Sequence, residues 1–423
     1  MSPLKAATRL LQRAECWGLL LRVVLMPVGA CWDLYSNYWI SHQWVYHGTI
    51  PLQQYGGYLF LWPIFHLHSA WLWLIRPLLG SGDIWGEGLT PLLSLTDMWQ
   101  HAPDLEAFYL HPHIHWILFL LKCPFVLTEC LLIYLMLRAE TVPAQSRETL
   151  RWFLWLNPFS LYSIALFGGW DIMPTTLVVA SALLVRRHTI WAGLCLSVAA
   201  IMKVFPVLLW PFFLLLGAQS SRERLSLVVG TTIPIVLYFG VGGWLGLPLL
   251  NTAFGIPHYA FVISSELPLH FSHDRLYPFL VGYVMLVFHA AEHRRSPSWT
   301  TLVRYCAASL LLFYSVSFFH PQYILWVVPF LAIVVALHPR WWWMVGLQAL
   351  CLGLYTLQWG GILTTYLVAP LNPRFFMHCP SPLDWLVKSS VNPDVVFGVV
   401  HSIFAGVSLW MMALMLRRRP ERA

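Results

Sequence analysis

Long apolar stretches with almost no charge recur along the chain and constrain its fold more than any other feature. Three of them cover residues 114–137, 225–247 and 394–416. A helix of roughly 20 mostly apolar residues can cross the hydrocarbon core of a membrane. Of the 423 residues, 58 % are hydrophobic and 10 % are charged, whereas soluble domains carry about 25 % charged residues. The sequence therefore predicts an all-α polytopic membrane protein, with residues 1–423 as a single integral membrane domain.

Basic residues lie between pairs of apolar stretches, and Lys and Arg favour the cytoplasmic side of membrane proteins. With these clusters inside, the chain makes about twelve crossings, within a range of about 10–13, and both termini are cytoplasmic. The clusters explain the net charge of +7, and no aromatic-interleaved basic stripe indicates a nucleic-acid partner. The predicted pairs of spans are 17–31 with 114–137, 152–168 with 172–185, 190–203 with 204–217, 225–247 with 276–291, 301–318 with 323–338, and 341–359 with 394–416.

The segment 32–113 is the longest break in this pattern, and we expect a large outer or lumenal loop with a cap at 81–110. Its apolar part, 56–80, contains a proline, two histidines and an arginine that interrupt it. We interpret this part as an interfacial or re-entrant helix, because a crossing here would turn every later basic cluster outward. The residues that follow Asp33 are expected to form a substrate loop.

Two carboxylates lie at predicted outer turns. Asp33 follows the first apolar run, where it can act as a general base toward a hydroxyl, cap a helix, or pair with Arg275. Asp171 follows Gly168 and Gly169, which allow a tight turn or a close approach to a ligand. The alternative for Asp171 is an ordinary polar turn residue.

Ionisable residues also interrupt apolar runs. Lys122 and Glu129 are seven residues apart, so they share one face of a helix. Such residues usually line a cavity; the alternative is a lysine that extends to the membrane surface and a glutamate that pairs elsewhere. Lys203 lies in an apolar run before Pro206; it can bind a lipid phosphate or extend to the surface.

The stretch HPQYILW at 320–326 is the most distinctive one. His320, Gln322 and Tyr323 offer hydrogen bonds, and Trp326 offers an aromatic face, which together suit a sugar; an aromatic belt at the membrane surface is the alternative. The eight cysteines form no CxxC pair, and the HPHIH stretch at 111–115 brings its histidines to one face only when extended. No metal site is predicted.

In this order, the motifs resemble the GT-C superfamily of polyprenol-phosphate-sugar-dependent glycosyltransferases. The likeness covers residues 17–335 and is nearest to the glycosyltransferase-87-like prokaryotic mannosyltransferases, with the catalytic subunit of the first glycosylphosphatidylinositol mannosyltransferase as a more distant relative. The residues that carry it are Asp33, Tyr38, Gly48, Pro51, Lys122, Pro124, Glu129, Asn157, Pro158, Gly169, Asp171, Met202, Lys203, Pro206 and the 320–326 stretch.

The resemblance implies an inverting transfer of a sugar, mannose in many relatives, from a polyprenyl phosphate to an acceptor hydroxyl. Asp33 matches the family's catalytic aspartate, and Lys203 with Arg275 would neutralise the departing phosphate. The expected donor- and acceptor-binding residues are Tyr38, Glu129, Asp171, Lys203, Arg275, His320, Gln322, Tyr323 and Trp326.

The partners implied are the lipid-linked donor, membrane lipids, and a glycolipid, glycan or protein acceptor; an accessory subunit is left open. The site would face the outside of a prokaryotic plasma membrane or the lumen of the endoplasmic reticulum. No cofactor is predicted, and a divalent metal is left open because position 31 is Cys where many relatives have a second acid. Two alternatives remain: a secondary transporter that couples ions through Glu129 and Lys203, and a membrane scaffold subunit.

Overall fold

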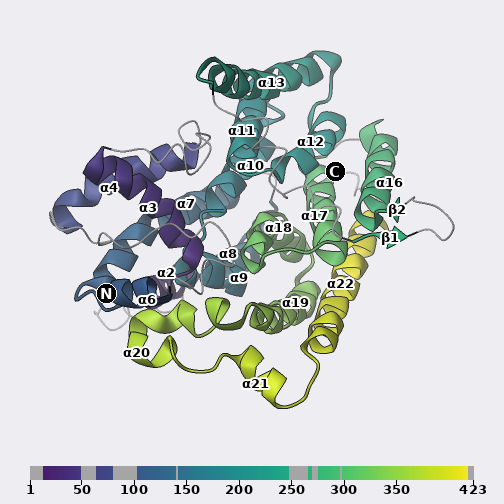
Figure 1. Ribbon diagram of the computed structural model, residues 1–423. Coiled ribbons are helices and arrows are strands. Elements are labelled where there is room, and N and C mark those ends of the chain that lie inside the picture. Colours follow the sequence, from purple (N-terminus) through teal and green to yellow (C-terminus); the bar gives the residue numbers. More distant parts are fainter. Residues whose placement is uncertain are drawn as a thin grey trace, which may run out of the picture. The chain divides into compact units, whose positions relative to one another are not determined.

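The computed structural model describes residues 13–48, 63–79, 102–139, 142–246, 265–268, 275–295 and 298–417, and these residues are mostly helical (Figure 1). Within these ranges, three helices are long and apolar enough to cross a membrane: α7 (Ile114–Arg138), α13 (Ser221–Trp244) and α22 (Pro393–Arg417). They coincide with the three apolar stretches named at the outset. The structure is therefore compatible with an all-α membrane protein, while the number of crossings stays a prediction.

The chain forms two compact units, and each is assembled from separate stretches of sequence. The first contains residues 1–130, 151–172 and 353–397, and the second contains residues 131–150, 173–352 and 398–423. The predicted cap at 81–110 falls largely outside the described residues.

The first unit is built around the N-terminal helices and half of α7. In this unit, α3 (Trp32–His47) lies beside α4 (Pro63–Leu79) (Figure 1). The position of α4 coincides with that of the predicted interfacial helix. The further helices of the unit are α2 (Ala14–Leu25), α6 (Ala102–Tyr109), α9 (Pro158–Ser160), the π-helix η3 (Leu161–Leu166), the 3-10 helices η8 (Thr356–Leu363) and η9 (Tyr366–Leu371), α20 (Pro373–Phe376) and α21 (Pro382–Lys388). The helix α8 (Arg147–Leu156) is divided between the two units.

The predicted substrate loop contains Tyr38, Trp39 and residues 47–58, and its part up to His47 is helix α3 and not a loop. Its remainder from residue 49 lies outside the described residues. Among the side chains of α3 that the structure describes, the buried ones are Leu34, Tyr35, Tyr38, Ser41 and His42. Their spacing of three and four residues is that of one helical face. Because two of the five are polar, hydropathy alone did not reveal this face.

The second unit contains the long helix α13, most of α22, and several apolar helices that are shorter than a full membrane crossing. Its elements are η2 (Ala144–Ser146), α10 (Ile172–Leu184), α11 (Thr189–Met202), α12 (Pro206–Phe212), the π-helix η4 (Phe213–Gly217), α13, the strands β1 (Leu267–Pro268) and β2 (Arg275–Leu276), α16 (Pro278–Glu292), η5 (His293–Arg295), α17 (Trp299–Val316), η6 (Pro321–Trp326), α18 (Val328–Leu337), η7 (Pro339–Trp341), α19 (Trp342–Tyr355) and most of α22. The two strands pair antiparallel as a short hairpin.

Small residues bring α11 and α13 into close contact in this unit. A Cβ atom at Gly193 would lie 2.6 Å from the backbone oxygen of Leu227, so only glycine fits there. Close backbone approach through small residues is typical of helix pairs in membranes. The Ser197 hydroxyl adds a hydrogen bond of 2.7 Å to the carbonyl oxygen of Thr231.

Candidate functional site

The first unit joins the segment that leads into Asp33 to the segment that leads into Asp171. The backbone amide of Cys31 donates to the carbonyl oxygen of Phe167 at 3.0 Å. Asp33 follows in the first turn of α3 and is half-buried, and Asp171 is fully buried four residues beyond Phe167. A carboxylate in the first turn favours the helix dipole, while the N-cap position of α3 is Cys31, without a side-chain cap hydrogen bond.

The Asn157–Pro158 pair explains how the Asp171 segment is shaped. The Asn157 side chain accepts hydrogen bonds from the amides of Phe159 and Ser160, which caps the helix that Pro158 begins. This helix continues into the π-helix η3. Gly168 follows η3, and its φ of +84° is rarely adopted by residues other than glycine. The chain then turns sharply toward Asp171.

Lys122 contacts both segments. Its side chain is completely buried in α7, and its ammonium contacts backbone oxygens. The Nζ atom donates to the carbonyl oxygens of Met26 at 2.9 Å, Ala165 at 2.9 Å, Leu166 at 2.7 Å, and also Gly29. Lys122 therefore binds the protein backbone, an outcome that the sequence did not predict.

Glu129 forms a buried ion pair with Arg22 of α2. The Nε–Oε2 distance is 2.6 Å and the Nη2–Oε1 distance is 2.5 Å, which is the bidentate geometry of strong arginine–carboxylate pairs. The Arg22 Nη1 atom also donates to the carbonyl oxygens of Gly18 at 2.9 Å and Trp155 at 2.7 Å. Arg22 was missed in the sequence, although it lies inside the apolar run 17–31 and such a residue needs a partner.

Tyr38 is also directed into the first unit. Its hydroxyl donates to the carbonyl oxygen of Leu121 at 2.7 Å, and its ring stacks on His68 with 4.5 Å between centroids. Tyr38 is fully buried. Its predicted contact with substrate stays a prediction.

A C-terminal segment covers the joined backbone of the first unit. Leu363 and Leu367 pack against Cys31 and Phe167 in one buried cluster, and the amide of Ala30 donates to the carbonyl oxygen of Leu367 at 2.8 Å. The sequence placed residues 360–393 in an outer segment without such a role. No local pattern indicated this contact, because Leu363 and Leu367 lie far along the chain from both Cys31 and Phe167.

The second unit places Lys203 over an aromatic stack. Lys203 follows the last residue of α11, and its Nζ atom lies 4.7 Å from the ring centroid of Tyr323. Tyr323 stacks on Trp326 at 4.5 Å, and Trp326 stacks on Phe205 at 4.4 Å. A lysine over an aromatic face is stabilised by a cation–π interaction. Phe205 was not among the predicted site residues.

The His320 and Gln322 side chains belong to the same turn. Pro321 begins η6, His320 precedes it with extended backbone, and Gln322 is buried. The Tyr314 hydroxyl donates to the carbonyl oxygen of Tyr323 and fixes this turn to α17. In the second unit, Lys203 lies over the Tyr323 ring, and Tyr323 and Trp326 share the 320–326 turn with His320 and Gln322. That these residues form a shared site stays a prediction.

Arg275 pairs with Glu266 across the β1–β2 hairpin. The hydrogen bond from Arg275 lowers the pKa of the Glu266 carboxyl below its usual range. Both side chains are exposed. The guanidinium therefore has a carboxylate partner within its own hairpin.

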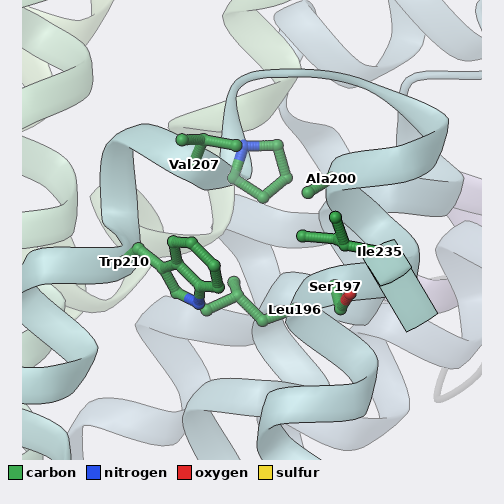
Figure 2. Close-up of a pocket in the computed structure, with 7 residues that line it drawn as sticks. Leu196, Ser197, Ala200, Val207, Trp210 and Ile235 are labelled. Carbon is green, nitrogen blue, oxygen red and sulfur yellow. The ribbon is translucent and has the colours of Figure 1, made fainter. Parts of the chain in front are cut away.

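An apolar pocket of about 10 Å³ lies between α11, α12 and α13. Figure 2 shows Leu196, Ser197 and Ala200 of α11 facing Val207 and Trp210 of α12, with Ile235 of α13 beside them. This volume is close to what one water molecule needs, so the pocket is too small for a sugar.

The predicted residues fall into two groups: Asp33, Tyr38, Glu129 and Asp171 in the first unit, and Lys203, Arg275, His320, Gln322, Tyr323 and Trp326 in the second. In the described part of the chain, no group of three or more His, Cys, Asp or Glu side chains is placed to hold a metal ion. Comparisons with protein-family models, curated proteins and solved structures found no match to this chain.

Proposed function

We propose that the protein is a membrane glycosyltransferase that moves a sugar from a polyprenyl phosphate to an acceptor hydroxyl on the extracytoplasmic or lumenal face. The sugar is a hexose, and mannose is the first candidate. The observation that carries the proposal is the hydrogen bond between the segments of Asp33 and Asp171. Two carboxylates on adjacent backbone, in a chain with 10 % charged residues, favour acid–base chemistry over a purely structural role.

Asp33 is the general base in this mechanism. It takes the proton of the acceptor hydroxyl while the hydroxyl oxygen attacks the anomeric carbon. The bond from that carbon to the phosphate oxygen breaks, and the phosphate leaves with the electron pair on the opposite face. The configuration at the anomeric carbon is inverted. Asp171, which is fully buried, is assigned to hydrogen bonding of the sugar.

The second unit supplies the groups suited to the donor head group. Lys203 carries a positive charge that can neutralise a phosphate, and Tyr323 and Trp326 present ring faces beside it. His320 and Gln322 add hydrogen-bonding groups on the same turn. The isoprenoid chain of the donor stays in the bilayer, so no large pocket is needed for it.

The first test is an assay of the purified protein with a panel of polyprenyl-phosphate sugars and identification of the product by mass spectrometry. Asp33→Asn should abolish transfer while donor binding and folding are kept. Asp384→Asn is the matched control, because Asp384 is an exposed residue that caps α21. Full turnover by Asp33→Asn would refute the assignment of the base.

The transporter alternative is tested with the same preparation in proteoliposomes. Glu129, which that alternative requires for ion coupling, is paired with Arg22 in the structure. Co-purified polyprenyl phosphate supports the transferase. Solute uptake driven by an ion gradient, without sugar transfer from any donor, would refute the transferase proposal.

A further inference from the structure

The buried ammonium of Lys122 has an unusual set of partners. It contacts four backbone carbonyl oxygens, although an ammonium has three N–H donors. Two of the oxygens, of Met26 and Gly29, belong to the link before α3. The other two, of Ala165 and Leu166, belong to the last turn of η3, where carbonyls have no amide partner within the helix.

The two carbonyl pairs lie on the two segments that lead into Asp33, the proposed base, and Asp171, the proposed sugar-binding carboxylate. Gly29 precedes Asp33 by four residues, and Leu166 precedes Asp171 by five. Carbonyl dipoles directed at one point repel one another, and a buried carbonyl without a donor is destabilising. A cation at that point removes the repulsion and satisfies the carbonyls together.

Glycines at both segments show how tightly the chain packs around this ammonium. A Cβ atom at Gly168 would lie 3.2 Å from Lys122 Cε and 3.1 Å from Leu34, the neighbour of Asp33. A Cβ atom at Gly29 would lie 2.5 Å from the Leu166 side chain. The Lys122 stem is thus in direct reach of both segments.

We propose that Lys122 is a positioning residue, whose ammonium holds the Asp33 segment against the Asp171 segment through four backbone carbonyls. The proposal rests on the proposed function for its catalytic meaning, while the link itself can be measured without turnover. Lys122 does not touch the reacting atoms. It determines whether the two segments that lead into Asp33 and Asp171 stay joined.

The experiment measures amide hydrogen exchange of the full-length protein in lipid nanodiscs. Lys122→Met keeps the apolar stem and removes the donors. We expect amides of residues 26–34 and 163–171 to exchange at least about tenfold faster, as local opening becomes easier. Lys388→Met is the matched control, because Lys388 is an exposed lysine of the same unit. Unchanged exchange in Lys122→Met would overturn the proposal.

Chemical rescue provides the second measurement and covers the case in which Lys122→Met does not fold. Lys122→Ala is purified with n-propylammonium, which replaces the missing atoms from Cγ to Nζ. We expect this cation to restore slow exchange at residues 26–34 and 163–171, and tetramethylammonium, which has the charge but no N–H donor, to fail. If amide exchange in Lys122→Ala is the same with n-propylammonium, with tetramethylammonium and without an added cation, the positioning role of Lys122 is refuted.

Turnover separates this inference from the proposed function. Where the wild-type chain transfers sugar, Lys122→Met should lower kcat at least about tenfold with little change in the KM for the donor, and n-propylammonium should restore the rate of Lys122→Ala. A wild-type chain that transfers no sugar from any donor refutes the proposed function. It leaves the exchange and rescue results as the test of the link.

Discussion

Removing the charge of Glu129 should destabilise the first unit strongly. In Glu129→Gln, the Arg22 guanidinium stays buried and loses its carboxylate, although it keeps the carbonyls of Gly18 and Trp155. Breaking one side of a buried pair costs about 3–5 kcal/mol. Because Arg22 keeps its carbonyl bonds, the expected loss in free energy of unfolding for Glu129→Gln is about 3 kcal/mol. Arg22→Met also removes the carbonyl bonds and leaves an anion, so about 5 kcal/mol is expected.

The free energy of unfolding is measured in mixed micelles with a denaturing detergent, and the two changes are combined as Arg22→Met with Glu129→Gln. Because the double variant buries no charge, it should be more stable than Arg22→Met alone. Glu15→Gln is the matched control, because the Glu15–Arg151 pair is 3.0 Å long with side chains 35 % and 38 % exposed. Such a pair contributes at most about 1 kcal/mol.

Equal effects of Glu129→Gln and Glu15→Gln would refute this reasoning, and so would strictly additive losses in the double variant. The result also decides how Glu129 is used. A residue that binds donor should change the KM for the donor with little loss of stability. A residue of a buried ion pair should do the reverse.

Three further predictions concern single side chains. Gly230→Ala should destabilise the protein by about 1–3 kcal/mol, because its Cβ would clash with backbone of α11; Gly240→Ala in the same helix meets no atom within 4 Å and should unfold at the wild-type temperature. Hydrogen bonds from Ser381 lower the pKa of Asp384, so the cap of α21 should be intact above the ordinary pKa range of an Asp and be lost as the pH falls through the lowered pKa, with faster amide exchange in α21; a pH-independent exchange pattern after correction for the intrinsic rate would contradict this. Burial lowers the pKa of His68 to about 3, so unfolding should become easier as the pH falls from about 6.5 toward 3, and His68→Phe should show a flatter dependence of unfolding free energy on pH.

The positions of many helices could be predicted from hydropathy and charge alone. The predicted spans 225–247 and 394–416 correspond to α13 and α22. Lys122 and Glu129 share a helical face, as their spacing indicates, since both contact residues of the segment 18–29. These features depend on residues that are near one another in the sequence.

The rest depends on partners far along the chain. Glu129 is 107 residues from Arg22, and neither residue type identifies the other. The first predicted span, 17–31, is interrupted in the structure because α2 ends at Leu25 and α3 begins at Trp32. Hydropathy does not detect this break, since the residues of the turn are themselves mostly apolar.

The breaks between helices explain why Arg22 and Lys122 lie inside apolar runs. In a bilayer every backbone carbonyl needs a donor, and non-helical backbone is tolerated only where the protein supplies one. Arg22 and Lys122 supply donors to carbonyls of Gly18, Met26 and Ala165, among others. A basic residue in an apolar run should therefore first be considered as a hydrogen-bond donor to backbone carbonyls, and only then as a substrate-binding residue. The requirement applies to cations and not to carboxylates, which accept hydrogen bonds and cannot satisfy a carbonyl. For this reason Asp33 and Asp171 remain the side chains on which a catalytic role is best tested.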